Sequence, residues 1–261
     1  MDILHRFNEG YNWMLSKGDP RVQSWPLMET PVPLLTLLVL YLVMVYQGPR
    51  AMAPHKPLPL TSVLVAYNLA LVCLSAYMFY EFLVTSILSG YSFKCQPVDY
   101  SNDPLAIRMA NVCWWYFFSK IIEFLDTAFF ILRKKNNQVT FLHVYHHCTM
   151  PINWWLGVKY VAGGQVFVMT ILNCFVHIVM YSYYGLSALG PHMKKYLWWK
   201  RYLTVLQLSQ FFAVIVHTGY NMTTNCSFPT GFNYAVFIYA ITLVLLFSNF
   251  FKNTYSKSKE D

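Results

Sequence analysis

Three histidines in the stretch LHVYHHC (142–148) are the residues best suited to chemistry. His143, His146 and His147 are spaced at i, i+3 and i+4, so an α-helix presents all three on one side. Imidazole can be a nucleophile, an acid or a base near neutral pH, and it also binds metals. The spacing alone therefore leaves catalysis, metal binding and packing open.

Further polar groups lie inside strongly apolar stretches, at spacings that place each set on one helical face. The first set is Lys120, Glu123 and Asp126. The second set is Asn173, His177, Tyr181 and Tyr184. The third set is Gln207, Gln210 and His217. Such groups are costly within a membrane and mark functional sites. We expect these faces to meet the three histidines around one internal cavity, with Lys120 paired to Glu123.

The composition predicts an integral membrane protein. Of the 261 residues, 56% are hydrophobic and only 11% are charged, against about 25% charged in soluble domains. Seven apolar segments are long enough to span a bilayer. They are 31–47, 60–88, 109–132, 141–160, 164–188, 198–220 and 232–251. We expect an all-α fold of seven transmembrane helices in a single domain, 1–261.

The basic residues predict how the chain is oriented. Twelve Lys and Arg fall on one side of the predicted membrane and six on the other. Because cytoplasmic loops carry the excess of basic residues, the tail 252–261 is expected in the cytosol and the segment 1–30 in the lumen. This distribution also accounts for the net charge of +8 without a nucleic-acid partner.

The predicted luminal loops add further expectations. They hold two of the six cysteines, Cys95 and Cys226, which an oxidising compartment allows to pair. Asn221 and Asn225 begin N-glycosylation sequons. On the other side, Lys257 and Lys259 near the C-terminus predict retrieval to the endoplasmic reticulum.

A metal site is not expected. HxxHH occurs in membrane di-iron enzymes, but those need several histidine boxes, and this chain has one box among eight histidines. A metal-free reaction such as acyl transfer from a thioester fits histidine, asparagine and tyrosine better. A transporter with a polar intramembrane site and a di-iron desaturase or hydroxylase are the alternatives.

Four strings in this order resemble the ELO family of very-long-chain fatty acid elongases. They are KIIEFLDT (120–127), LRKKNNQVTFLHVYHH (132–147), NCFVHIVMYSYYG (173–185) and QLSQF (207–211). The sequence is similar to the branch of this family that makes the longest saturated and polyunsaturated chains. The resemblance implies a multi-pass membrane enzyme of the endoplasmic reticulum, with six helices enclosing an acyl-chain tunnel.

The resemblance also implies the reaction, which is condensation of a long-chain acyl-CoA with malonyl-CoA to a 3-ketoacyl-CoA. No cofactor is expected. The partners implied are the other enzymes of the elongation cycle and membrane lipid, with assembly into homo- or hetero-oligomers left open.

Roles for the residues follow as hypotheses. His146 forms an acyl-imidazole, His143 and His147 orient it, and His177 with Asn173 stabilises the enolate. The other polar residues bind substrate, with Arg133, Lys134 and Lys135 attracting the CoA phosphates. Cys174 and Cys148 are rival nucleophiles, and a direct ternary-complex reaction is the alternative to a covalent one.

Overall fold

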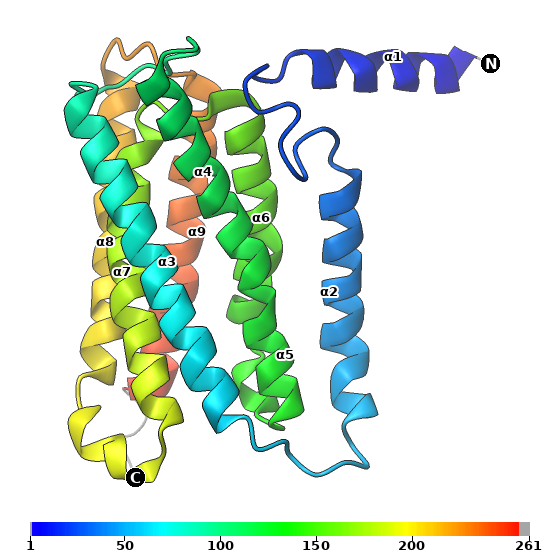
Figure 1. Ribbon diagram of the computed structural model, residues 1–261, viewed down its shortest axis with the longest axis vertical. Helices are drawn as coiled ribbons and strands as arrows, with labels where there is room; N and C mark the ends of the chain where they lie inside the picture. The colour runs from blue at the N-terminus through cyan, green and yellow to red at the C-terminus, as the bar shows by residue number, and fades with distance from the viewer. Residues whose placement is uncertain (1, 256–261) are drawn as a thin grey trace.

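The computed structural model describes residues 2–255, and all the regular elements in this range are helices (Figure 1). The helices are α1 (Asp2–Ser16), α2 (Val32–Ala51), α3 (Thr61–Leu88), α4 (Pro104–Ile122), α5 (Phe124–Leu132), α6 (Phe141–Val161), α7 (Val166–Ala188), α8 (Lys200–Thr223) and α9 (Thr230–Tyr255). Two 3-10 turns, Asn136–Gln138 and Pro191–Tyr196, complete the described elements. The all-α prediction is confirmed, whereas Lys257 and Lys259 lie outside the described residues.

Five of the described helices, α2, α3, α7, α8 and α9, are long and apolar enough to cross a membrane. The segments predicted at 109–132 and 141–160 are different. The first is divided at Glu123 into α4 and α5, and the second, α6, carries the histidines and Lys159. These two segments carry the polar side chains that lower their hydropathy.

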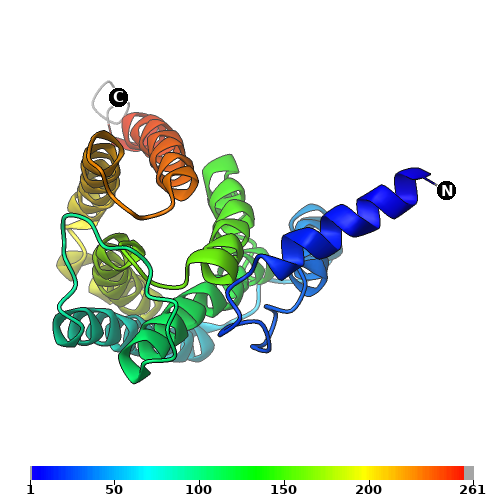
Figure 2. The ribbon, with the colours of Figure 1, turned by 90° about the horizontal axis from the view of Figure 1, so that it is seen from above.

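The long helices run side by side, and their two ends differ in chemistry (Figure 1). At the disulfide end, Cys95 is joined to Cys226, which confirms the predicted pair. At the basic end lie 133–135 and 194–201. The second of these segments is close to the last described turn of α9, where the Tyr255 hydroxyl is 3.5 Å from the Lys200 carbonyl. Seen from above, α4, α6, α7, α8 and α9 are arranged in a ring (Figure 2).

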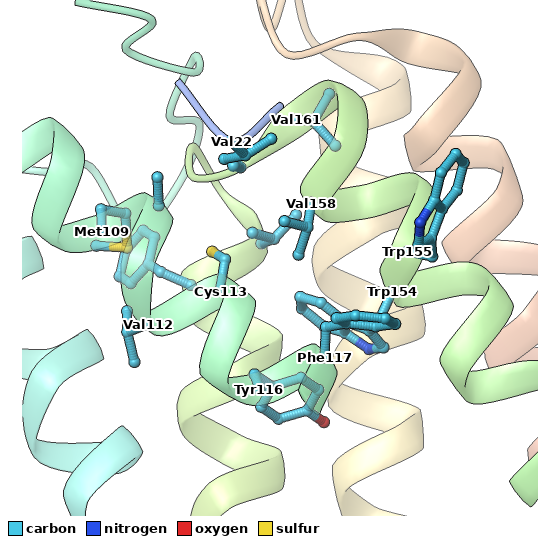
Figure 3. Close-up of a cluster of buried hydrophobic side chains, with 14 of the residues drawn as sticks. Val22, Met109, Val112, Cys113, Tyr116, Phe117, Trp154, Trp155, Val158 and Val161 are labelled. Carbon is cyan, nitrogen blue, oxygen red and sulfur yellow. The ribbon is translucent and has the colours of Figure 1, made fainter. Parts of the chain in front are cut away.

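A strap formed by residues 17–31 closes the disulfide end over α4 and α6. Val22 and Met28 are fully buried, and Val22 lies between Met109, Val112 and Cys113 of α4 and Val158 and Val161 of α6 (Figure 3). The strap is also held by polar contacts. Lys159 Nζ donates to the Met28 carbonyl at 2.9 Å, and a buried ion pair joins Asp19 to Arg21 at 2.6 Å.

Candidate active site

Helix α6 positions the histidine box at the basic end of the bundle. Thr140 caps the helix, and its hydroxyl accepts from the backbone N–H of His143 at 3.3 Å. This cap satisfies one of the free N–H groups at a helix start. The box therefore begins within one turn of the loop that carries Arg133, Lys134 and Lys135.

His143 is held by a chain of hydroxyl groups. Its Nε2 lies 2.7 Å from the Thr127 hydroxyl on α5, which in turn lies 3.1 Å from the Tyr41 hydroxyl on α2. Tyr41 is 2% exposed and stacks on Phe124. The role of Tyr41 was missed in the sequence because the apolar segment 31–47 has no acid or base, and pairing between two helices distant in sequence leaves no local pattern.

His146 and His147 differ in their surroundings. The ring of His147 is buried between its neighbours, with centroids 4.2 Å from His143 and 5.4 Å from His146. It also lies 6.3 Å from the ring of Tyr41. Within residues 2–255 the ring nitrogens of His146 and His147 both lack a hydrogen-bond partner, whereas His143 is bonded to Thr127. The one ring contact of His146 in this range is with His147, so His146 makes the fewest side-chain contacts of the three histidines.

The junction between α4 and α5 carries a buried charge cluster. Lys120 Nζ lies 2.8 Å from Glu123 Oε1, as the sequence predicts, and both side chains are almost fully buried. His177 on α7 completes the cluster, with its Nδ1 3.4 Å from Glu123 Oε1 and 3.5 Å from Lys120 Nζ. Because buried charges require partners, this cluster fixes the orientation of the His177 ring.

Three further hydrogen bonds join α7 to its neighbours. The Tyr181 hydroxyl donates to Asp126 Oδ2 at 3.1 Å. The Asn173 side chain accepts from the Tyr116 hydroxyl of α4 and donates to Gln210 Oε1 of α8 at 3.2 Å. Tyr116 was not among the predicted site residues, although it is fully buried and packs on Trp154 with ring centroids 4.2 Å apart (Figure 3).

A cavity of about 150 Å³ begins at Asn173 and extends toward the disulfide end. Tyr116, Asn173 and Gln210 form its polar wall. The remaining walls are mainly apolar side chains of α6, α7, α8 and α9, including Met150 and Leu243. Met150 is one turn beyond His146 on α6, and Asn173 is one turn from His177 on α7, so both histidines lie next to the polar end of the cavity.

Three of the predicted substrate contacts are not brought to this site. The His217 Nε2 lies 3.0 Å from the Phe93 carbonyl at the disulfide end, because the loop after α3 folds over that part of α8. Gln207 donates to the sulfur of Met180 at 3.5 Å. Tyr184 contacts the Tyr181 ring and is 41% exposed.

The two sequons also differ. Asn221 is 3% exposed, and its Nδ2 donates to the His217 carbonyl at 2.8 Å. A glycan on that nitrogen requires the last turn of α8 to open, so the fold argues against this part of the prediction. Asn225 is exposed in the following loop.

The basic loop beyond α5 is open to solvent at Lys134 and Lys135, and Arg133 is half-buried. Lys134 adopts a positive φ of 54° and donates to the Ala53 carbonyl at 2.9 Å. Within residues 2–255, no three His, Cys, Asp or Glu side chains are grouped so that they could hold a metal ion.

Comparison with known proteins gives concordant matches. The model of the ELO, or GNS1/SUR4, family matches residues 26–261. Very long chain fatty acid elongase 4 of Homo sapiens is 52% identical over 97% of this chain and 80% of its own length. The elongase 4 of Mus musculus is 51% identical over 97% and 81%. Very long chain fatty acid elongase 7 of Drosophila melanogaster is 46% identical over 98% of this chain and 79% of its own length.

Proposed function

The chain belongs to the ELO, or GNS1/SUR4, family, and from that premise we propose that it catalyses the condensing step of very-long-chain fatty acid elongation. A long-chain acyl-CoA and malonyl-CoA give a 3-ketoacyl-CoA two carbons longer, with release of CO₂ and CoA. Because the relatives named above are very long chain fatty acid elongases, the acyl substrate is expected to be long.

The observation that supports the proposal is an apolar cavity whose lining residues Met150 and Asn173 lie one helical turn from His146 and His177. The cavity walls favour an alkyl chain, since each buried CH₂ contributes about 0.8 kcal/mol. An acyl chain lying there toward the disulfide end has its thioester beside His146 and His177. CoA then extends toward the basic end, where Arg133, Lys134 and Lys135 attract its phosphates.

In the first stage, a ring nitrogen of His146 attacks the thioester carbonyl. The new C–N bond replaces the C–S bond, CoA leaves as the thiolate and takes up a proton, and the acyl group remains on the imidazole. His146 suits this role because its one ring contact within residues 2–255 is with His147, whereas the His147 ring packs against His143, His146 and Tyr41. His143, held through Thr127 and Tyr41, and His147 orient the ring.

In the second stage, malonyl-CoA loses CO₂, and the electron pair of the broken C–C bond forms an enolate. Its carbon attacks the acyl group and releases His146. His177 and Asn173 stabilise the enolate oxygen, with the buried pair of Lys120 and Glu123 fixing the His177 ring. No cofactor takes part in either stage.

The membrane arrangement is part of the same proposal. The five apolar helices, the α4–α5 pair and α6 supply seven spans, with α3, α4, α6, α7, α8 and α9 as the six around the acyl tunnel. The disulfide end lies in the lumen of the endoplasmic reticulum and the basic end in the cytosol, the source of malonyl-CoA. Reduction and dehydration of the product fall to partner enzymes of the cycle.

The test uses purified, metal-stripped protein in detergent with a long-chain acyl-CoA alone, followed by peptide mass spectrometry. We expect an acyl adduct on the 142–148 peptide that malonyl-CoA converts to 3-ketoacyl-CoA. His146→Ala should abolish the adduct, whereas Cys148→Ser and Cys174→Ser should keep it. Product without any adduct overturns the covalent step in favour of a ternary complex. The absence of product under every condition overturns the condensation itself.

A further inference from the structure

Helix α1 presents large apolar side chains that no other described part of the protein covers. Ile3, Leu4 and Phe7 are 87%, 79% and 72% exposed. At 100° per residue they share one arc of about 120° with three further apolar residues, Tyr11, Met14 and Leu15. The polar arc holds His5, Asn8, Glu9, Asn12 and Ser16. Trp13 is the one aromatic residue outside the apolar arc. The helix is therefore strongly two-sided.

The position of α1 relative to the bundle is fixed. It leaves the disulfide end close to the end of α6, where the Tyr160 hydroxyl donates to the Met14 carbonyl at 3.1 Å and the Asp19 N–H donates to the Lys159 carbonyl at 2.7 Å. The buried pair of Asp19 and Arg21 follows directly. From this attachment, α1 runs nearly perpendicular to the long helices (Figures 1 and 2).

The direction of α1 places it beside the lipid-facing surface of α2. Seen from above, α1 extends across the end of α2 (Figure 2). The outer side chains of α2 include Val39 and Leu40, which are 60% and 59% exposed, as expected where acyl chains surround a span. A two-sided helix at right angles to the spans and level with their ends matches the geometry of helices that lie in the bilayer interface.

We propose that α1 is an interfacial helix that binds the leaflet at the disulfide end, with the arc from Ile3 to Leu15 facing the acyl chains. Its charges do not select anionic lipid, because the sequence of the helix has one arginine and two acidic residues. The partner is therefore a lipid surface of neutral headgroups. By holding the start of the strap, α1 couples the bilayer surface to Val22 and Met28 in the core.

The test measures the depth of spin labels along α1 in the full-length protein. The background is Cys73→Ser with Cys148→Ser, since Cys113 and Cys174 are buried and Cys95 and Cys226 are paired. Phe7→Cys places a label on the apolar arc, and Asn12→Cys is the matched control on the polar arc. Both variants are reconstituted in phosphatidylcholine bilayers, and collision rates with oxygen and with a water-soluble nickel chelate are compared.

We expect oxygen collisions to dominate at residue 7 and nickel collisions at residue 12, with the same pattern when the bilayer contains added anionic lipid. High nickel accessibility at both positions means that the helix stands in water and overturns the proposal. Low accessibility to both reagents at residue 7 means that protein, such as a second copy of this chain, covers the arc, and this also overturns it. Neither readout depends on elongation activity.

Discussion

Removing the charge of Glu123 should destabilise the protein strongly. The carboxylate lies 2.8 Å from Lys120 Nζ, and the two side chains are 3% and 1% exposed. Breaking a buried pair by removal of one partner costs about 3–5 kcal/mol, because the other charge is left uncompensated in a medium of low dielectric constant. We therefore expect Glu123→Gln to lower the free energy of unfolding by about that amount.

The double variant Lys120→Met with Glu123→Gln tests the physical cause. Once both charges are removed, no unpaired ion remains, and replacement of a buried pair by neutral groups is often nearly neutral for stability. We expect the free energy of unfolding of the double variant to lie within about 1 kcal/mol of that of the parent protein, which is the usual range for a tolerated core substitution. It should nevertheless lose elongation activity, because the His177 ring is no longer held by a charged carboxylate.

A second ion pair of the same chain supplies the control. Arg108 Nε lies 2.6 Å from Glu81 Oε2, a shorter distance, but the Arg108 side chain is 35% exposed. Solvent screening limits such a pair to about 0–1 kcal/mol, so Glu81→Gln should have a small effect. Unfolding in mixed micelles, followed by tryptophan fluorescence, measures all four proteins. The reasoning is refuted if Glu123→Gln costs no more than Glu81→Gln, or if the double variant is destabilised as much as Glu123→Gln alone.

Three further predictions concern the histidine box, the disulfide and the exposed sequon. Thr127→Val should lower the elongation rate about tenfold with folding intact, because an unmade buried hydrogen bond costs about 1–3 kcal/mol, and Thr127→Ser should retain the rate in the same assay. Cys95→Ser should lower stability by about 2–5 kcal/mol in micelle unfolding, as loss of a native disulfide usually does, and an unchanged unfolding curve would contradict this. Asn225→Gln should remove the glycosidase-sensitive gel shift of protein made in cells, whereas Asn221→Gln should leave it. The reverse pattern would mean that the last turn of α8 opens, and no shift in the parent protein would contradict a luminal position of this loop.

The apolar runs of the sequence predict the long helices well, because each span must satisfy its own backbone hydrogen bonds. The run at 109–132 is the exception. The helix is interrupted at Glu123, and no proline or glycine near this position predicts the break. Helix α1 was missed for the opposite reason, since its pattern is amphipathic rather than continuously apolar.

The candidate site follows the same logic. The pairing of Lys120 with Glu123 is local, at i and i+3, and spacing is enough to predict it. The hydrogen bond between Tyr41 and Thr127 joins residues 86 positions apart and depends on how α2 packs against α5. The contact of His217 could not be predicted from its helical face, because the loop that supplies the Phe93 carbonyl has no periodic pattern.

The disulfide has a consequence for how the chain is made. Cys95 and Cys226 are separated by 131 residues, and ribosomes add about 5–20 residues per second. Cys95 therefore waits roughly 7–26 s for its partner at those rates, while α4 to α8 are synthesised. All the helices that line the cavity, apart from α9, must be inserted in the correct order before the bond can close. Formation of this one covalent link thus reports, during biogenesis, that the cavity-lining helices before α9 are in place.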